Sequence, residues 1–139
     1  MCLEDDIRIG NSANLWRRIP FRKTFIVPDP KSLGGLRPSS LAFSKSSIGK
    51  RTMSVYWAEK AKENNREHGD YLTEKDALLV SLNAEFVRNE GLGICWSEDE
   101  TDAEHADVFN GTANKNFSRT TRNALAEHAT WLIGPIVEP

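Results

Sequence analysis

Proline and glycine interrupt this chain at short intervals, which limits the length of every helix and strand. Pro20 closes the first apolar segment, and Pro28 and Pro30 bracket the end of the second. Proline lacks a backbone donor and restricts the residue before it, so helices and interior strands tend to stop there. Turn signals follow at Gly34-Gly35 and Asn110-Gly111. The chain must therefore fold from many short elements.

The apolar segments between these breaks are rich in β-branched and aromatic residues, which is typical of strands. We predict strands over 15–19, 24–27, 92–96, 105–109 and 131–133, and an extended segment over 36–44. The run 78–82 is a buried strand or a helix, and its periodicity does not distinguish the two because the run is short.

Three segments have helical composition, namely 54–65, 84–90 and 118–129. Ser54 and Asn83 are the expected N-caps of the first two. Strands and helices mix without a repeated βαβ rhythm. We therefore predict an α+β fold, with a small mixed or antiparallel sheet and two to four helices.

The last helix has the clearest apolar periodicity in the chain. Leu125, Ala129 and Leu132 fall at positions i, i+4 and i+7. This spacing predicts that the three side chains form one buried seam.

The length of 139 residues is that of one domain. We expect residues 1–14 to be a loosely held arm and residues 15–139 to be the globular domain. No apolar run approaches the roughly 18 residues of a membrane span, and the acidic start does not resemble a secretory signal. The two cysteines follow no metal-ligand spacing, which predicts free thiols, no metal site and a cytoplasmic location.

The net charge of −2 hides an asymmetry along the chain. Residues 1–62 hold 12 Lys and Arg against 5 Asp and Glu, whereas residues 63–139 hold 6 against 15. In one interpretation, the two halves attract each other within one fold. In the other, the basic half meets a phosphate, a nucleotide, a nucleic acid or an acidic partner.

Arginines and hydroxyl groups gather in the first third of the chain. Arginine holds phosphate or carboxylate with a planar fork, and hydroxyl groups complete such a shell. Neighbours in a strand point to opposite faces, so only one of the first two arginines can face a pocket. The alternative is that these arginines form structural ion pairs. The candidate anion-binding residues are Arg17, Arg18, Arg37, Ser39 and Ser40, with Thr52 and Ser54 further along.

His105 follows an acidic segment that includes residues 98–104. Histidine changes charge near neutral pH and suits acid–base work. The alternative is a solvated acidic loop that leads into a strand whose histidine packs locally. His68 and His128 are interpreted as ordinary surface histidines.

Several segments resemble a pattern that recurs in small bacterial proteins and carries no assigned activity. They read Leu-Trp-Arg-Arg-Ile, Leu-Arg-Pro-Ser-Ser-Leu-Ala-Phe, Met-Ser-Val and His-Ala-Asp-Val-Phe-Asn-Gly. More weakly, an early strand arginine before a Gly/Arg segment is similar to toxins of the ADP-ribosyltransferase type. That similarity implies that Arg17 grips a dinucleotide, that Glu59 orients its ribose and that NAD is the cofactor.

The sequence has no Walker loop, dinucleotide fingerprint, nucleophile elbow or zinc-protease motif. Tryptophan and arginine are typical of interface centres, and the chain has four tryptophans. We predict a bacterial binding module or accessory subunit that acts through a protein partner and holds an anion or phosphate.

Two other functions stay open. One is an NAD- or nucleotide-handling enzyme that uses Arg17, Arg37 and Ser39, with His105 or Glu59 as the proton-handling group. The other is a protein that contacts nucleic acid, which the pI of about 5.9 disfavours.

Overall fold

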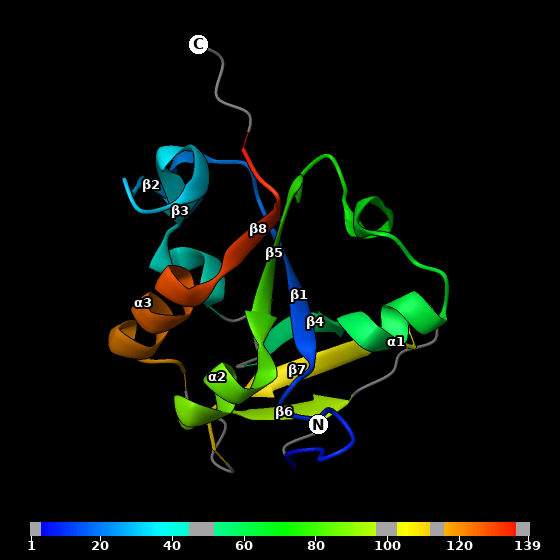
Figure 1. Cartoon of the computed structure of the whole chain (residues 1–139). Helices are drawn as coiled ribbons and strands as arrows, with labels where there is room; N and C mark the ends of the chain where they lie inside the picture. The colour runs from blue at the N-terminus through cyan, green and yellow to red at the C-terminus, as the bar shows by residue number, and fades with distance from the viewer. Residues whose placement is uncertain (1–3, 45–51, 97–102, 112–115, 136–139) are drawn as a thin grey trace.

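The computed structural model describes residues 4–44, 52–96, 103–111 and 116–135. Six strands form one antiparallel sheet in the order β6-β7-β4-β1-β5-β8 (Figure 1). Their bounds are Asn14–Ile19 (β1), Met53–Trp57 (β4), Leu78–Asn83 (β5), Gly93–Trp96 (β6), His105–Phe109 (β7) and Thr130–Ile133 (β8). Ile26–Pro28 (β2) and Leu36–Pro38 (β3) form a separate two-stranded sheet.

Three α-helices lie in the described part of the chain, so the predicted α+β fold is confirmed. They are Ala58–Glu63 (α1), Ala84–Asn89 (α2) and Arg119–His128 (α3). Short 3-10 helices are Lys23–Phe25 (η1), Leu33–Gly35 (η2), Ser40–Phe43 (η3) and His68–Tyr71 (η4). None of the described helices is long and apolar enough to cross a membrane.

Each face of the large sheet packs against its own set of helices. Alternate residues of a strand point to opposite faces, so Leu15 of β1 joins the larger core and Trp16 the smaller one. Side chains from α2, α3 and η3 pack in the larger core, and those from α1 and η4 pack in the smaller one. Figure 1 shows α3 with the two-stranded sheet on one side of the large sheet and α1 on the other.

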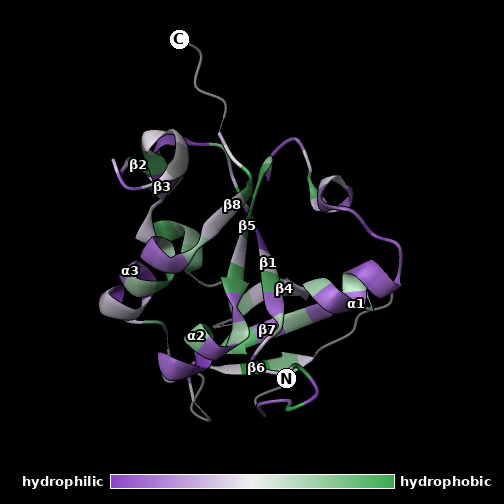
Figure 2. Cartoon of the chain, viewed as in Figure 1, coloured by the Kyte–Doolittle hydropathy of each residue, from purple (hydrophilic) through white to green (hydrophobic). Residues whose placement is uncertain are grey.

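The undecided run 78–82 forms strand β5, between β1 and β8. Leu78, Val80 and Leu82 belong to the larger core, and Leu79 belongs to the smaller one. A strand that is buried on both faces has a continuous apolar sequence, which explains the ambiguity. Figure 2 shows β5 as largely hydrophobic, in contrast to the hydrophilic chain that follows α1.

The predicted helix over 54–65 is wrong in its first part. Residues Met53–Trp57 form β4, and helix α1 begins only at Ala58, with Trp57 as its N-cap residue. Met53 and Val55 are both fully buried on the core face of the sheet. Packing of these alternating side chains therefore outweighs the helical composition, and Ser54 is a strand residue instead of a cap.

The predicted strand over 24–27 and the extended segment over 36–44 are each shorter than expected. Strand β2 begins only at Ile26, because η1 occupies the residues before it. Strand β3 ends at Pro38, and η3 follows. The turn between the two strands contains Gly34 and Gly35, whose φ angles of 78° and 76° favour glycine.

The predicted seam of the last helix is wrong beyond Leu125. Leu125 is fully buried, but Ala129 is the C-cap residue, where the backbone leaves the helix with ψ at 141°. Leu132 consequently lies in β8 and packs against the smaller core. Ala126, beside Leu125, is the helix's other buried residue.

The first described residues are packed onto the domain, in contrast to the loose arm predicted for residues 1–14. Ile9 is fully buried, and the backbone N–H of Asp6 donates to the carbonyl of Ile94 at 2.7 Å. The guanidinium of Arg88 contacts Asp5 at 3.1 Å. Residues 4–13 are thus part of the folded structure.

Cys95 of β6 is buried and disulfide-bonded, so the prediction of a free thiol is wrong at this position. Cys2 lies outside the described residues. The disulfide at Cys95 therefore does not support the cytoplasmic location, which was inferred from free thiols. The cytoplasmic location stays a prediction. The acidic segment before His105 lies largely outside the described ranges.

Candidate anion-binding groove

Arg17, the first candidate for an anion site, donates its hydrogen bonds to backbone carbonyls. Its Nε donates to the carbonyl of Ala42 at 2.9 Å, and Nη1 donates to that of Ser54 at 2.8 Å. Nη2 donates to the carbonyl of Ser44 at 3.2 Å. Burial lowers the pKa of Arg17 to about 10, so the group stays charged at neutral pH. The side chain therefore joins η3 and the residue after it to β4.

The other candidates make contacts of their own. Arg18 points to the opposite face of the sheet, where Nη1 donates to the carbonyl of Tyr71 at 3.3 Å. Arg37 belongs to the two-stranded sheet and pairs with Asp29 at 3.4 Å. Arg17 and Arg18 therefore lie on opposite faces of the sheet, and an anion site at the five candidates stays a prediction. Ser40 is the first residue of η3. Ser39 precedes it, and the Oγ of Ser39 donates to the carbonyl of Thr24 at 2.7 Å.

The two acid–base candidates have separate surroundings. Glu59 of α1 accepts a hydrogen bond from the backbone N–H of Asn14 at 2.9 Å and so fixes the start of β1. The ring of His105 lies edge-on to Tyr56, with the centroids 6.0 Å apart. Both residues make contacts that stabilise the fold.

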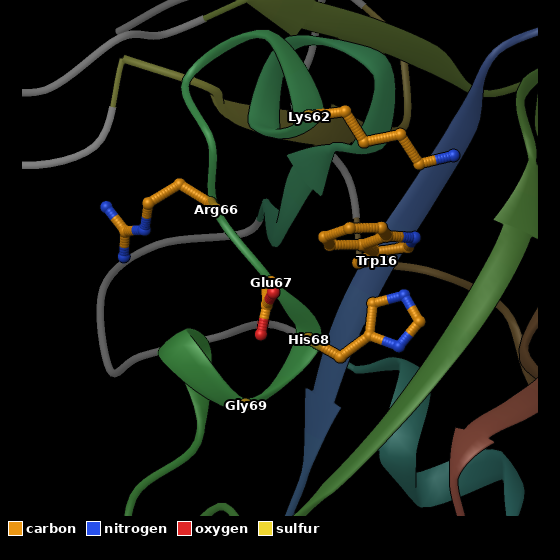
Figure 3. A pocket seen from close by; sticks show the side chains of 6 residues that line it. All are labelled: Trp16, Lys62, Arg66, Glu67, His68 and Gly69. Atoms are coloured by element: carbon orange, nitrogen blue, oxygen red, sulfur yellow. The ribbon is translucent and has the colours of Figure 1, made fainter.

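A groove lies on the smaller-core face of the sheet, between α1 and η4. Trp16 of β1 forms part of its wall, although the residue is only 3% exposed. The groove has a volume of about 390 Å³, within the range of ligand sites. Its lining residues are Trp16, Lys62, Arg66, Glu67, His68 and Gly69 (Figure 3). We call it the Trp16 groove.

Three nitrogen-bearing side chains of this groove have no hydrogen bond or ion pair with any described residue. They are the indole of Trp16, the ammonium of Lys62 and the imidazole of His68. Figure 3 shows their nitrogen atoms along one side of the groove. Within the described ranges, only Nε of Arg122 is a buried side-chain polar atom without a partner, so Nε1 of Trp16 is not sealed in the core.

The local fold places these three groups together. Strand alternation turns Trp16 toward α1 and η4, and Lys62 lies in the last turn of α1. His68 opens η4, and its ring meets the indole of Trp16 edge-on, with centroids 4.6 Å apart and planes at 89°. His68 is therefore held in place by an aromatic contact, in contrast to the ordinary surface histidine that we predicted.

A buried carboxylate, that of Glu104, contacts Arg66 of the groove lining. Glu104 is 1% exposed and accepts hydrogen bonds from the hydroxyl of Tyr71 and from Nδ2 of Asn64, the latter at 3.2 Å. Nη1 of Arg66 lies 3.6 Å from Oε1 of Glu104. The segment between α1 and η4 is thereby tied to the residue that precedes β7.

Sequence reasoning missed this groove because its parts come from distant segments. Trp16 and His68 are 52 positions apart, and no local spacing connects them. The available signal was the alternation in β1, which puts Trp16 on the face opposite to Leu15. The sequence does not give the order of the strands in the sheet, so it could not show that α1 and η4 cover the Trp16 face of β1.

Comparisons with protein-family models, with curated proteins and with solved structures found no match to this chain. The resemblance to small bacterial proteins thus stays a prediction. Among the described residues, no group of three or more His, Cys, Asp or Glu side chains gathers in a way that could hold a metal ion.

Proposed function

We propose that this domain is a binding module that takes an anionic group of a protein partner in the Trp16 groove. The observation that carries the proposal is that Trp16, Lys62 and His68 have no hydrogen-bond or ion-pair partner among the described residues. A charged donor beside N–H donors of aromatic rings is a common arrangement for holding a carboxylate or a phosphate.

The composition of the groove favours an acidic protein segment over nucleic acid. Lys62, Glu67 and Gly69 are exposed, so an extended chain can reach the groove from solvent. Glu67 places a negative charge at the rim, and the whole chain carries −2. Both charges oppose a long polyanion, whereas one or two carboxylates fit beside Lys62.

The lining supports binding more than catalysis. It contains no serine, threonine or cysteine that could act as a nucleophile. Arg17 and Glu59, which the weaker resemblance would assign to NAD, contact backbone groups at other places. We therefore do not extend the proposal to a nucleotide-handling enzyme.

The indole N–H signals of ¹⁵N-labelled protein test the proposal directly. On titration with a short poly-glutamate peptide, we expect the Trp16 signal to shift, with a Trp16→Phe variant used for assignment. Trp96 and Trp131 serve as internal controls, because their indoles donate to the carbonyls of Ala103 and Leu36. Their signals should move little.

Lys62→Gln should weaken peptide binding about tenfold, which corresponds to one charge-assisted hydrogen bond. Lys31→Gln is the matched control, because Lys31 is exposed and lies near the two-stranded sheet. A Trp16 signal that stays in place at saturating peptide would refute the proposal.

A further inference from the structure

We infer that Arg66 is a latent anion-binding cation that Glu104 holds out of the Trp16 groove, so that Glu104 limits the affinity of the groove for acidic ligands. This inference rests on the proposed function. In this inference Glu104 is a positioning residue, because it determines whether the guanidinium of Arg66 is available to the ligand.

Arg66 lines the groove, but its guanidinium is directed elsewhere. Figure 3 shows the side chain pointing away from Trp16. Nη1 lies 3.6 Å from Glu104 and Nε lies 3.9 Å from Asp70. The guanidinium carbon also lies 4.8 Å from the centre of the Tyr71 ring. Two carboxylates and one aromatic face therefore compete with any ligand for this charge.

The contact between Arg66 and Glu104 is suited to exchange. At 3.6 Å it is an ion pair beyond ordinary hydrogen-bond length. Glu104 has two further donors, the hydroxyl of Tyr71 and Nδ2 of Asn64, which continue to hold its carboxylate if Arg66 leaves. Asp70 is likewise held by the backbone N–H of Glu67 at 2.7 Å. Release of Arg66 thus leaves both carboxylates hydrogen-bonded.

The ligand class follows from this competition. A segment with a single carboxylate is held by Lys62 and the ring nitrogens of Trp16 and His68. A segment with adjacent carboxylates presents a second anion, which the planar fork of Arg66 can hold only when Glu104 no longer competes for it. Removal of the Glu104 charge is therefore expected to strengthen the binding of consecutive acidic residues more than that of isolated ones.

Three variants test the inference, each titrated with the same poly-glutamate peptide and followed by the Trp16 indole signal. Glu104→Gln removes the competing charge but keeps an oxygen acceptor for Asn64, and it should tighten binding about fivefold. Arg66→Gln should change the affinity of the otherwise native protein by less than about twofold. The double variant should bind like the Arg66→Gln protein.

Two results would overturn the inference. One is a loss of binding in Arg66→Gln as large as that in Lys62→Gln, because Arg66 would then already serve the ligand. The other is tightening by Glu104→Gln that persists in the double variant, because another residue would then be responsible. A merely structural role for Glu104 predicts weaker binding in Glu104→Gln.

Asp70→Asn provides a second route if Glu104→Gln does not fold. The Asp70 side chain is 49% exposed, and its loss removes the other carboxylate beside Arg66. Smaller tightening is expected, and unchanged or weaker binding counts against the inference. Absence of binding in the native protein and in every variant would instead show that the proposed function has failed.

Discussion

At the scale of single residues, the arginines show how the same chemistry that suits a ligand site can organise a fold. Arg17 donates to the carbonyls of Ala42, Ser44 and Ser54, which belong to separate segments of the chain. Arginine could be recognised from the sequence as a donor that suits anions. Its acceptors could not, because they are brought to β1 by tertiary packing.

Arg17→Lys should destabilise the protein by about 2 kcal/mol or more, although it keeps the positive charge. A lysine ammonium cannot replace the planar fork, and partly buried carbonyls would lose their donors. Urea denaturation measures the loss in the free energy of unfolding. An anion site at Arg17 predicts the opposite pattern, in which stability is retained and ligand binding is lost.

His128 is half-buried and connects two helices, which corrects its interpretation as a surface histidine. Its ring stacks on Phe86 with the centroids 3.8 Å apart, and its Nε2 accepts the backbone N–H of Asn83 at 3.1 Å. Burial lowers the pKa of His128 below its ordinary value of 6.5, because the charged ring is poorly solvated there. The neutral form is also the one that can accept this hydrogen bond.

This lowered pKa predicts a pH dependence of stability. The unfolded chain binds a proton at His128 more readily than the folded chain does. The contribution of neutral His128 to the free energy of unfolding is therefore fully present above about pH 6.5 and is lost as the pH falls below it. Melting temperatures from about pH 7 to about pH 5 should fall less steeply in His128→Gln, which keeps an acceptor. Asp6, whose pKa the hydrogen bond from Arg8 lowers from 3.8, titrates below this window. Parallel pH profiles for the two proteins would contradict the prediction.

At the scale of elements, local patterns predicted most helices and strands but not their lateral order. The cap at Asn83 is local and was predicted correctly, since its side chain accepts the N–H of Phe86, whereas Ser54, the other predicted cap, is a strand residue. Strand β4 was missed because helical composition continues from it into α1. The Trp16 groove was missed for a different reason, since it exists only where β1, α1 and η4 meet.

Leu125→Ala should destabilise the domain by about 2–5 kcal/mol, because it leaves a cavity where α3 packs on the larger core. Leu125 is fully buried there, together with Ala126. Asn123→Ala is the matched control, because Asn123 is exposed on the same helix. Thermal or urea melts that show equal stability for the two variants would mean that α3 contributes little to the core.

At the scale of the whole molecule, the charge asymmetry of the chain does not become a simple division of the structure. The central strands β4 and β1 come from the basic half, and strands of the acidic half flank them on both sides. Ion pairs also form within each half, such as Arg37 with Asp29 and Arg66 with Glu104. An acidic partner is therefore attracted by individual cations, such as Lys62 in the Trp16 groove, more than by one basic face of the domain.

This arrangement predicts how salt affects binding of the poly-glutamate peptide. The protein and the peptide are both negatively charged overall, so long-range attraction is weak and the contact with Lys62 dominates. Raising NaCl from about 0.1 M to about 1 M shortens the Debye length from about 10 Å to about 3 Å and should weaken binding by about threefold to tenfold. Lys62→Gln should lose most of this dependence, whereas Lys31→Gln should keep it. Equal salt dependence in Lys62→Gln and the native protein would place the attracting charge outside the Trp16 groove, because screening acts only on the charges that contribute to binding.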